Sequence, residues 1–400
     1  MPDTNGTGRP AGAGASAPTI HGAPRLRLAE APAAQPAPSG ARSPAAPTRP
    51  RLDALTGLRG LAAAVVFIPH AGLVLSGRPE RVAELVGVPG SRALGFFFAL
   101  SGFVLTWATR PGDTARGFWQ RRFARIYPAY LVTLLAAVVV TGLVQRHPLP
   151  VGPFVATLFA VQAWFPHSRW YFSYNGVDWT IACEVFFYLV FPLFIRPLAR
   201  LGRVGRRRLQ VILLGSLSAF AVAAEVSGVG WLANQFPVAR LPEFVLGCTL
   251  AIDIARDQVI AGRVRLRSAI LVAGAAWLVS VLPVPFVGAL PLLTVAMLLL
   301  LNAGAMADLA GRRSLLTRRP LVWFGEVSFC FYLVHQLVLK VVASLPIARL
   351  DLPGGGLVWA VLCFGLAIPV ASALHRWVEI PGNALLRGRS RRRPSVTLQE

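Results

Sequence analysis

The sequence predicts an all-α integral membrane protein, and three observations lead to this prediction. Hydrophobic residues make up 55% of the 400-residue chain and charged residues only 14%, which is too little charge for an ordinary soluble domain. Long apolar runs recur along the chain at lengths that suit membrane-spanning helices. Arginines gather in short segments between these runs, as in cytoplasmic loops. We expect about ten transmembrane helices with both termini cytoplasmic, in a multi-pass protein of the cell membrane.

Composition also excludes other classes. Residues 1–50 are rich in Ala, Pro and Gly and hold no apolar run, which predicts a disordered tail. The net charge of +23 does not indicate nucleic-acid binding, because the arginines lie between apolar runs rather than beside exposed aromatic residues. The four cysteines lie singly within apolar runs, so we expect neither a metal site nor a disulfide framework.

Eleven apolar runs follow the tail, and charge decides which of them spans. They cover approximately residues 55–77, 93–109, 127–145, 151–165, 178–195, 209–228, 237–254, 268–284, 285–306, 321–345 and 356–374. If all eleven spanned, the basic segments would fall on opposite membrane faces. Omitting the run at 151–165, which is short and flanked by prolines, places every basic segment on one side. We interpret 151–165 as a re-entrant or interfacial element on the outer side.

The first run carries two ionisable residues, Arg59 and His70. They are eleven residues apart, close to three helical turns, so they share one helix face about 16 Å apart along the axis. Ionisable residues within a span are costly and point to function. A neutral imidazole suits the removal of a proton from a hydroxyl. The structural alternative is that His70 is satisfied by a neighbouring helix.

Glu184 and His335 are predicted to lie at the same outer depth as His70. A buried carboxylate needs a partner, and His70 is the natural one. Glu184 would then either orient His70 or form an ion pair that only holds two helices together. Both interpretations predict that Glu184 and His70 are in contact. His335, in FYLVHQ, fits a structural and a functional role equally.

Three arginines, Arg121, Arg122 and Arg125, begin the third span. They are either topology anchors or, with Arg59, a site for the phosphates of a nucleotide. We interpret Gly102 as a helix-packing residue. For Glu243 and Glu379 we expect structural pairing with the nearby Arg240 and Arg376.

Seven motifs occur in order along residues 51–382. They read LDALTGLRGLAAAVVFIPH, FFFALSGFVLT, FWQRRFARIYPAY, WTIACEVFFY, RLPEFVLG, YLVH and RWVEIP. In this order and spacing the chain resembles the acyltransferase-3 family of integral-membrane O-acyltransferases. The resemblance implies a transmembrane domain over 51–382, followed by a basic cytoplasmic tail over 383–400.

The resemblance also implies an activity and a set of site residues. It implies transfer of an acyl group, expected to be acetyl, from cytoplasmic acyl-coenzyme A to a hydroxyl, without a metal. The expected catalytic residues are His70, Glu184 and Arg59. The expected donor-binding residues are Arg121, Arg122, Arg125 and Ser101. The expected acceptor-binding residues are Asp178, Trp179, His335 and Glu243.

The acceptor is the least determined part of this prediction. We expect a hydroxyl of an extracytoplasmic or membrane-associated glycan. One alternative is a small secondary metabolite, such as a macrolide. Another, from a different class, is a proton-coupled exporter of glycans or lipids in which His70 and Glu184 relay protons, although the chain shows no internal repeat of the kind typical of transporters.

Overall fold

The computed structural model describes residues 50–75, 88–110, 112–256, 264–281, 286–346 and 355–388. Within these ranges every regular element is helical, so the predicted all-α class is confirmed. The α-helices are α1 (Asp53–Leu75), α3 (Val88–Ala108), α4 (Ala115–Val139), α5 (Val151–Leu158), α6 (Ser168–Tyr171), α7 (Trp179–Arg200), α8 (Arg203–Ser227), α9 (Trp231–Asn234), α10 (Pro237–Ala255), α11 (Leu266–Val281), α12 (Phe286–Leu309), α13 (Arg319–Ser344), α14 (Gly355–Leu374) and α15 (Ile380–Gly388). The remaining helical segments are the π-helices η2 (Val140–Val144) and η6 (His375–Glu379) and the 3₁₀-helices η3 (Gln162–Trp164) and η4 (Leu315–Thr317).

Seven helices are long and apolar enough to cross a membrane. They cover Asp53–Gly72, Ala115–Val144, Trp179–Arg200, Arg203–Ser227, Ala289–Leu309, Arg319–Ser344 and Gly356–Arg387. Two shorter apolar helices cover Leu94–Ala108 and Leu266–Val279. A helix therefore lies at each of the ten predicted spans, while the number that cross and the side of each terminus stay predictions.

The sixth predicted span, α10, is a 19-residue helix that carries three charged residues. Arg240 and Glu243 form an ion pair at 3.2 Å, and both side chains are almost fully buried. Asp253 accepts a hydrogen bond from the buried guanidinium of Arg206 on α8 at 2.8 Å. These charges are paired inside the bundle, which is how ionisable groups are accommodated in apolar surroundings. The predicted pairing of Glu243 with Arg240 is confirmed.

The run at 151–165 does not form a continuous helix. It contains α5, of eight residues, then a turn and the three-residue η3. Eight residues are too few to span a bilayer, as predicted from the flanking prolines. The hydroxyl of Tyr174 donates to the Pro150 carbonyl at 3.0 Å, and the indole of Trp231 donates to the Ala163 carbonyl at 2.9 Å. Hydrogen bonds therefore hold this segment near both of its ends, at Pro150 and at Ala163.

Glycines let two helix pairs approach closely. A Cβ atom on Gly102 of α3 would lie 1.9 Å from the Phe244 carbonyl oxygen of α10, and one on Gly247 would lie 1.9 Å from the Ala99 oxygen. Gly325 of α13 lies equally close to the Thr56 carbonyl oxygen of α1. Such contacts of backbone with backbone are typical of helix packing in membranes. The prediction that Gly102 is a packing residue is confirmed.

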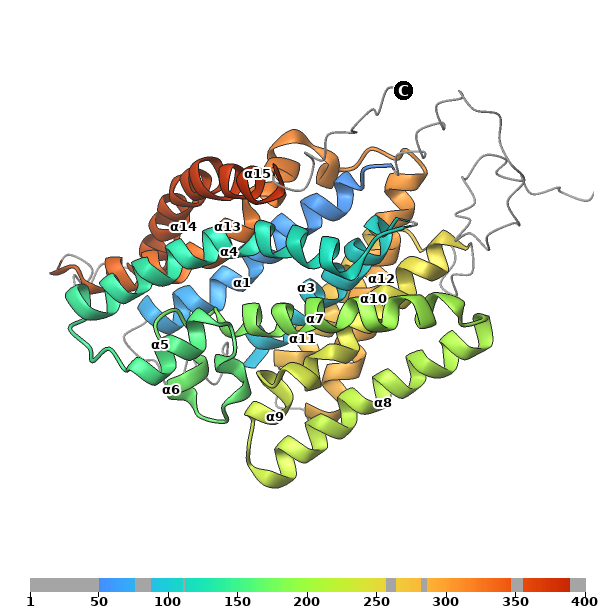
Figure 1. Ribbon diagram of the computed structural model, residues 1–400, viewed down its shortest axis with the longest axis horizontal. Helices are drawn as coiled ribbons and strands as arrows, with labels where there is room; N and C mark the ends of the chain where they lie inside the picture. Colours follow the sequence, from blue (N-terminus) through green and yellow to red (C-terminus); the bar gives the residue numbers. More distant parts are fainter. Residues whose placement is uncertain are drawn as a thin grey trace, which may run out of the picture.

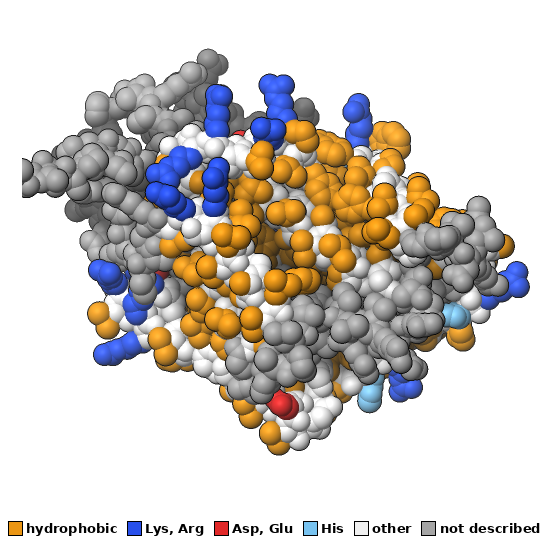
Figure 2. Space-filling view, turned by 180° about the vertical axis from the view of Figure 1, so that it is seen from behind, with side chains coloured by type: hydrophobic (Ala, Val, Ile, Leu, Met, Phe, Trp, Pro, Cys, Tyr) orange, Lys and Arg blue, Asp and Glu red, His pale blue; other side chains and the backbone are white. Residues whose placement is uncertain are grey.

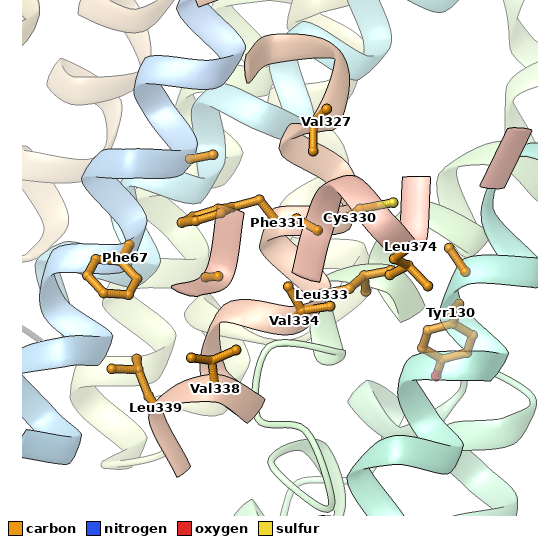
Figure 3. Packing of buried hydrophobic residues seen from close by; sticks show 14 of the residues in the cluster. Phe67, Tyr130, Val327, Cys330, Phe331, Leu333, Val334, Val338, Leu339 and Leu374 are labelled. Atoms are coloured by element: carbon orange, nitrogen blue, oxygen red, sulfur yellow. The ribbon is translucent and has the colours of Figure 1, made fainter. Parts of the chain in front are cut away.

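Helix α13 lies at the centre of the largest apolar cluster, which also includes residues of α1, α4 and α14. Figure 3 shows Phe67 of α1 and Phe331 of α13 on facing helices, and their ring centroids are 6.1 Å apart. Figure 1 shows α1, α4, α13 and α14 grouped together, with α8 at the opposite edge. The cluster therefore fixes the position of α1, the helix that carries Arg59 and His70.

The outer surface is strongly apolar. Figure 2 shows a broad hydrophobic face with basic side chains gathered along its upper and left margins. On α8 the exposed side chains include Val204, Val211 and Ile212. Such a face suits contact with lipid. The predicted tails fall largely outside the described residues, although residues 383–388 of the predicted C-terminal tail belong to α15.

Candidate active site

A cavity of about 160 Å³ lies between α1, α3, α4, α7 and α13. Most of its wall is apolar, built from residues such as Phe97, Val104 and Ile126. Its main polar lining residues are Arg59, Ser101, Arg122, Arg125, Glu184 and Tyr188. Five residues predicted for the site from the sequence therefore line one cavity, together with Tyr188, which was not predicted.

The arginines at this cavity are held in different ways. Arg59 donates from Nε to the Gly325 carbonyl of α13 at 2.9 Å. Arg125 forms an ion pair with the buried carboxylate of Glu379 at 2.6 Å. The Nε atom of Arg122 is buried and, within the described part of the chain, has no hydrogen-bond partner. A buried guanidinium nitrogen without a partner is costly, and an anionic ligand would satisfy it.

Arg121 lies apart from the other arginines of α4. It pairs with Asp113 at 2.9 Å, with both side chains partly exposed, and it does not line the cavity. Arg121 and Arg122 are adjacent, so a helix that turns Arg122 inwards turns Arg121 away. The structure therefore divides the predicted arginine cluster into residues inside and outside the cavity.

Glu184 has a partner other than the predicted one. The Tyr188 hydroxyl donates to a Glu184 carboxylate oxygen at 3.0 Å and lies 3.3 Å from the Ser101 hydroxyl. Among the described residues no hydrogen bond or ion pair joins Glu184 to His70, so the predicted contact is wrong. Glu184 and Tyr188 are four residues apart on α7 and therefore share one face, which is the sequence signal that could have identified Tyr188.

His70 instead contacts His335. The Nδ1 atom of His70 lies 2.9 Å from the Val66 carbonyl oxygen and 3.2 Å from Nε2 of His335. The Nδ1 atom of His335 lies 3.2 Å from the Phe331 carbonyl oxygen. The prediction that His70 and His335 lie at one depth is confirmed, and Glu184 is not part of their hydrogen-bonded network.

The histidine pair lies beside the cavity rather than in its wall. His70 and His335 do not line the cavity, but Tyr332 does, and its ring centroid is 5.7 Å from that of His335. The Tyr332 hydroxyl donates to the Val177 carbonyl at 3.1 Å and lies 3.0 Å from the Thr180 hydroxyl. Tyr332 is thus a fixed part of the wall next to the two imidazoles.

The residues predicted to bind the acceptor are dispersed. Asp178 is buried and accepts a hydrogen bond from the Asn175 amide at 2.9 Å. Trp179 is buried against the ring of Phe98, with centroids 6.3 Å apart. Glu243 is paired with Arg240, as described above. None of these three residues lines the cavity, and their present surroundings are those of packed interior groups.

Glu379 is the centre of a second polar cluster. Its carboxylate contacts Arg125, the His375 imidazole at 2.7 Å and the Cys330 thiol at 3.0 Å. The predicted pairing with Arg376 is therefore wrong: Glu379 is buried at the end of the π-helix η6 and pairs with His375 and Arg125 instead. Cys330, His375 and Glu379 offer ligand atoms within 4.8 Å of one another, a set that a metal ion could use. The same carboxylate already balances Arg125.

Comparison with known proteins matches residues 52–376 to the Acyl_transf_3 family, described as an acyltransferase domain. "Acyltransferase MdmB" of Streptomyces mycarofaciens is 36% identical over 372 residues, which cover 87% of this chain and 95% of that protein. "Peptidoglycan O-acetyltransferase OatA" of Listeria monocytogenes is 25% identical over 84% of this chain and 56% of its own length. "Exopolysaccharide production protein ExoZ" of Rhizobium meliloti is 26% identical over 76% of this chain and 92% of its own. No solved structure matches the chain. The chain belongs to the acyltransferase-3 family and is a membrane acyltransferase.

Proposed function

We propose that this enzyme transfers an acyl group, most simply acetyl, from acyl-coenzyme A to a hydroxyl of a small secondary metabolite such as a macrolide. The donor is cytoplasmic coenzyme A thioester, and the enzyme works in the bacterial cytoplasmic membrane. The observation that carries the proposal is the single cavity that joins Arg59, Arg122, Arg125, Ser101 and Glu184.

The choice of acceptor rests on which relatives the chain matches over their whole length. The match covers 95% of the length of MdmB, whose name does not mention a cell-wall glycan. It covers only 56% of the peptidoglycan O-acetyltransferase from Listeria. Peptidoglycan, the substrate in the name of that longer protein, is therefore a weaker candidate for the acceptor of this chain. The match to 92% of ExoZ keeps an exopolysaccharide hydroxyl as the second candidate.

The choice of donor rests on the composition of the cavity. Guanidinium groups bind phosphates through charge-assisted hydrogen bonds, and the buried Nε of Arg122 lacks a partner. The rest of the wall is largely apolar, from Phe97 to Ile126, and suits the apolar part of a thioester arm. A coenzyme A thioester combines these two chemistries in one extended molecule.

The chemistry assigned to this site is a direct transfer. His70 takes the proton of the acceptor hydroxyl, and the oxygen forms a C–O bond to the thioester carbonyl carbon. The C–S bond then breaks, and the departing thiolate receives the proton from His70. Thioester and alcohol become ester and thiol, and His70 returns to its starting state. An acyl-histidine intermediate is the alternative route through the same residue.

The decisive experiment uses the purified protein in lipid nanodiscs with radiolabelled acetyl-coenzyme A. A panel of macrolides with free hydroxyls and a matched panel of exopolysaccharide and peptidoglycan fragments are offered as acceptors. Thiol release is measured together with the mass of each product. We expect thiol release that depends on the macrolide, with one acetyl mass added to it.

Other outcomes separate the alternatives. Label found only on a glycan fragment would move the acceptor to the second candidate. Movement of a glycan or lipid across the membrane of a proteoliposome that contains the purified protein, without consumption of any thioester, would contradict acyl transfer and favour the transporter. A His70→Ala variant with wild-type turnover would remove His70 from the chemistry.

A further inference from the structure

We infer that His335 is the positioning residue of His70, in the role that a carboxylate holds in a catalytic triad. The inference rests on the proposed function, in which His70 is the base. Two contacts of the His335 ring carry the inference, one with the His70 ring of α1 and one with the Phe331 carbonyl of α13. His335 thereby takes the role that was predicted for Glu184, which contacts Tyr188 instead.

The protonation pattern follows from the neighbours of each nitrogen. Nδ1 of His335 lies 3.2 Å from the Phe331 carbonyl oxygen, which can only accept, so this nitrogen carries a proton. In a neutral imidazole the other nitrogen then has the lone pair, so Nε2 of His335 is an acceptor. It lies 3.2 Å from Nδ1 of His70. The hydrogen bond between the rings therefore requires a proton on Nδ1 of His70.

The second contact of His70 agrees with this assignment. Its Nδ1 atom also lies 2.9 Å from the Val66 carbonyl oxygen, one helical turn earlier. Both neighbours of Nδ1 accept hydrogen bonds, so a single N–H serves them. The lone pair of His70 is consequently on Nε2, the nitrogen that points away from both contacts and can take the hydroxyl proton.

The His335 ring is held rigidly enough to act as a support. Its side chain is 1% exposed. It stacks on Phe331 with an interplanar angle of 11° and meets the edge of Phe67 at 6.1 Å. Figure 3 shows Phe67 and Phe331 on either side of the α1–α13 contact. A fixed acceptor orients the base and stabilises the extra charge that forms when Nε2 takes a proton, as the buried aspartate of a triad does.

The test compares two substitutions of His335. His335→Phe keeps a ring of similar size but removes the acceptor nitrogen, and we expect kcat to fall about 10- to 100-fold with the KM for acyl-coenzyme A unchanged within about twofold. His335→Gln places an amide near the Nε2 position, and we expect it to recover at least about fivefold of that loss. The exposed His167→Gln serves as the control and keeps wild-type kcat.

A double variant shows whether the two histidines act as a unit. We expect His70→Ala and His70→Ala/His335→Phe to have the same residual activity, because a support contributes nothing once the base is gone. Additive losses, a wild-type kcat in His335→Phe, or a fall in His335→Gln as large as in His335→Phe would each overturn the inference. If the protein consumes no thioester, or if His70→Ala is fully active, the proposed function fails first.

A spectroscopic measurement tests the tautomer directly. The chain has six histidines, so ¹⁵N-histidine labelling with the His70 and His335 variants assigns the two signals. We expect both rings to be neutral with the proton on Nδ1. Observation of His70 protonated on Nε2 would overturn the inference even if the kinetics agreed, because the lone pair would then face the support.

Discussion

The cavity and the histidine pair share helix α1 but are built in opposite ways. The cavity takes its lining from five helices and contains three arginines, the Glu184 carboxylate, the Tyr188 hydroxyl that donates to it, and Ser101, whose hydroxyl contacts Tyr188. The histidine pair takes its groups from two helices and is enclosed by aromatic rings. The difference teaches that binding a large anion and moving a single proton require different surroundings. The first needs several charges at an opening, and the second needs one fixed acceptor.

Removal of the base should have the largest effect. We expect His70→Ala to lower kcat about 10²- to 10⁴-fold while the KM for the donor changes little, since the arginines of the cavity are untouched. Thiol release by the purified variant measures both constants. A rise in KM with an unchanged kcat would show that His70 contributes to donor binding, and it would contradict the division between a binding cavity and a proton-transferring histidine pair.

Charge reversal on α4 should act on binding alone. We expect Arg122→Glu to raise the KM for acyl-coenzyme A about 10- to 100-fold, because a charged hydrogen bond becomes a repulsion. Arg121→Glu is the matched control, since it is the adjacent residue, carries the same charge and lies outside the cavity. Equal effects of the two variants, measured at equal expression, would favour the interpretation of the arginines as topology anchors.

Loss of the support behind Arg125 should be milder. Glu379→Gln keeps the shape of the buried side chain but removes the charge that pairs with Arg125 at 2.6 Å. We expect a rise in donor KM of about fivefold, equivalent to about 1 kcal/mol, with kcat unchanged. Initial rates over a range of donor concentrations separate the two constants. A dominant loss of kcat would place Glu379 closer to the reaction than the structure indicates.

The smallest change concerns the residue that joins Ser101 and Glu184. Tyr188→Phe removes one hydroxyl and its hydrogen bond at 3.0 Å to Glu184. We expect a twofold to threefold change in donor KM, about the contribution of one hydrogen bond partly replaced by solvent. Binding of a non-hydrolysable coenzyme A analogue, followed by calorimetry, measures it. Loss of turnover comparable with that of His70→Ala would connect the two regions chemically.

Sequence reasoning reached the helices and the cavity better than the pairs within them. Apolar length and charge placed a helix at each predicted span, and the predicted grouping of Arg59 with arginines of α4 agrees with the cavity that Arg59, Arg122 and Arg125 line. It failed for the partner of His70, because the position of a residue along its own span does not fix which residues it faces across the bundle. Glu184 lines the cavity with Arg59 rather than lying beside His70, and the packing of α13 against α1 brings His335 to His70 instead.

The partner of Glu379 could not be predicted for a different reason. Its pairing was predicted from nearness along the chain, which favoured Arg376. The carboxylate pairs instead with His375, four residues earlier, and with Arg125 of α4. The pairing with Arg125 joins two segments that are far apart in the sequence, so spacing within HRWVE could not predict it.

The close contact of α1 with α13 at Gly325 has a consequence for how the enzyme can move. The two groups that accept hydrogen bonds from Arg59 and His70 are the Gly325 carbonyl and the His335 imidazole, and they lie ten residues apart on α13. Sliding or rotation of α1 against α13 would break both hydrogen bonds at once. We therefore expect α1 and α13 to move together as one rigid unit. A rearrangement that admits a bulky acceptor would then occur in the helices packed around this pair.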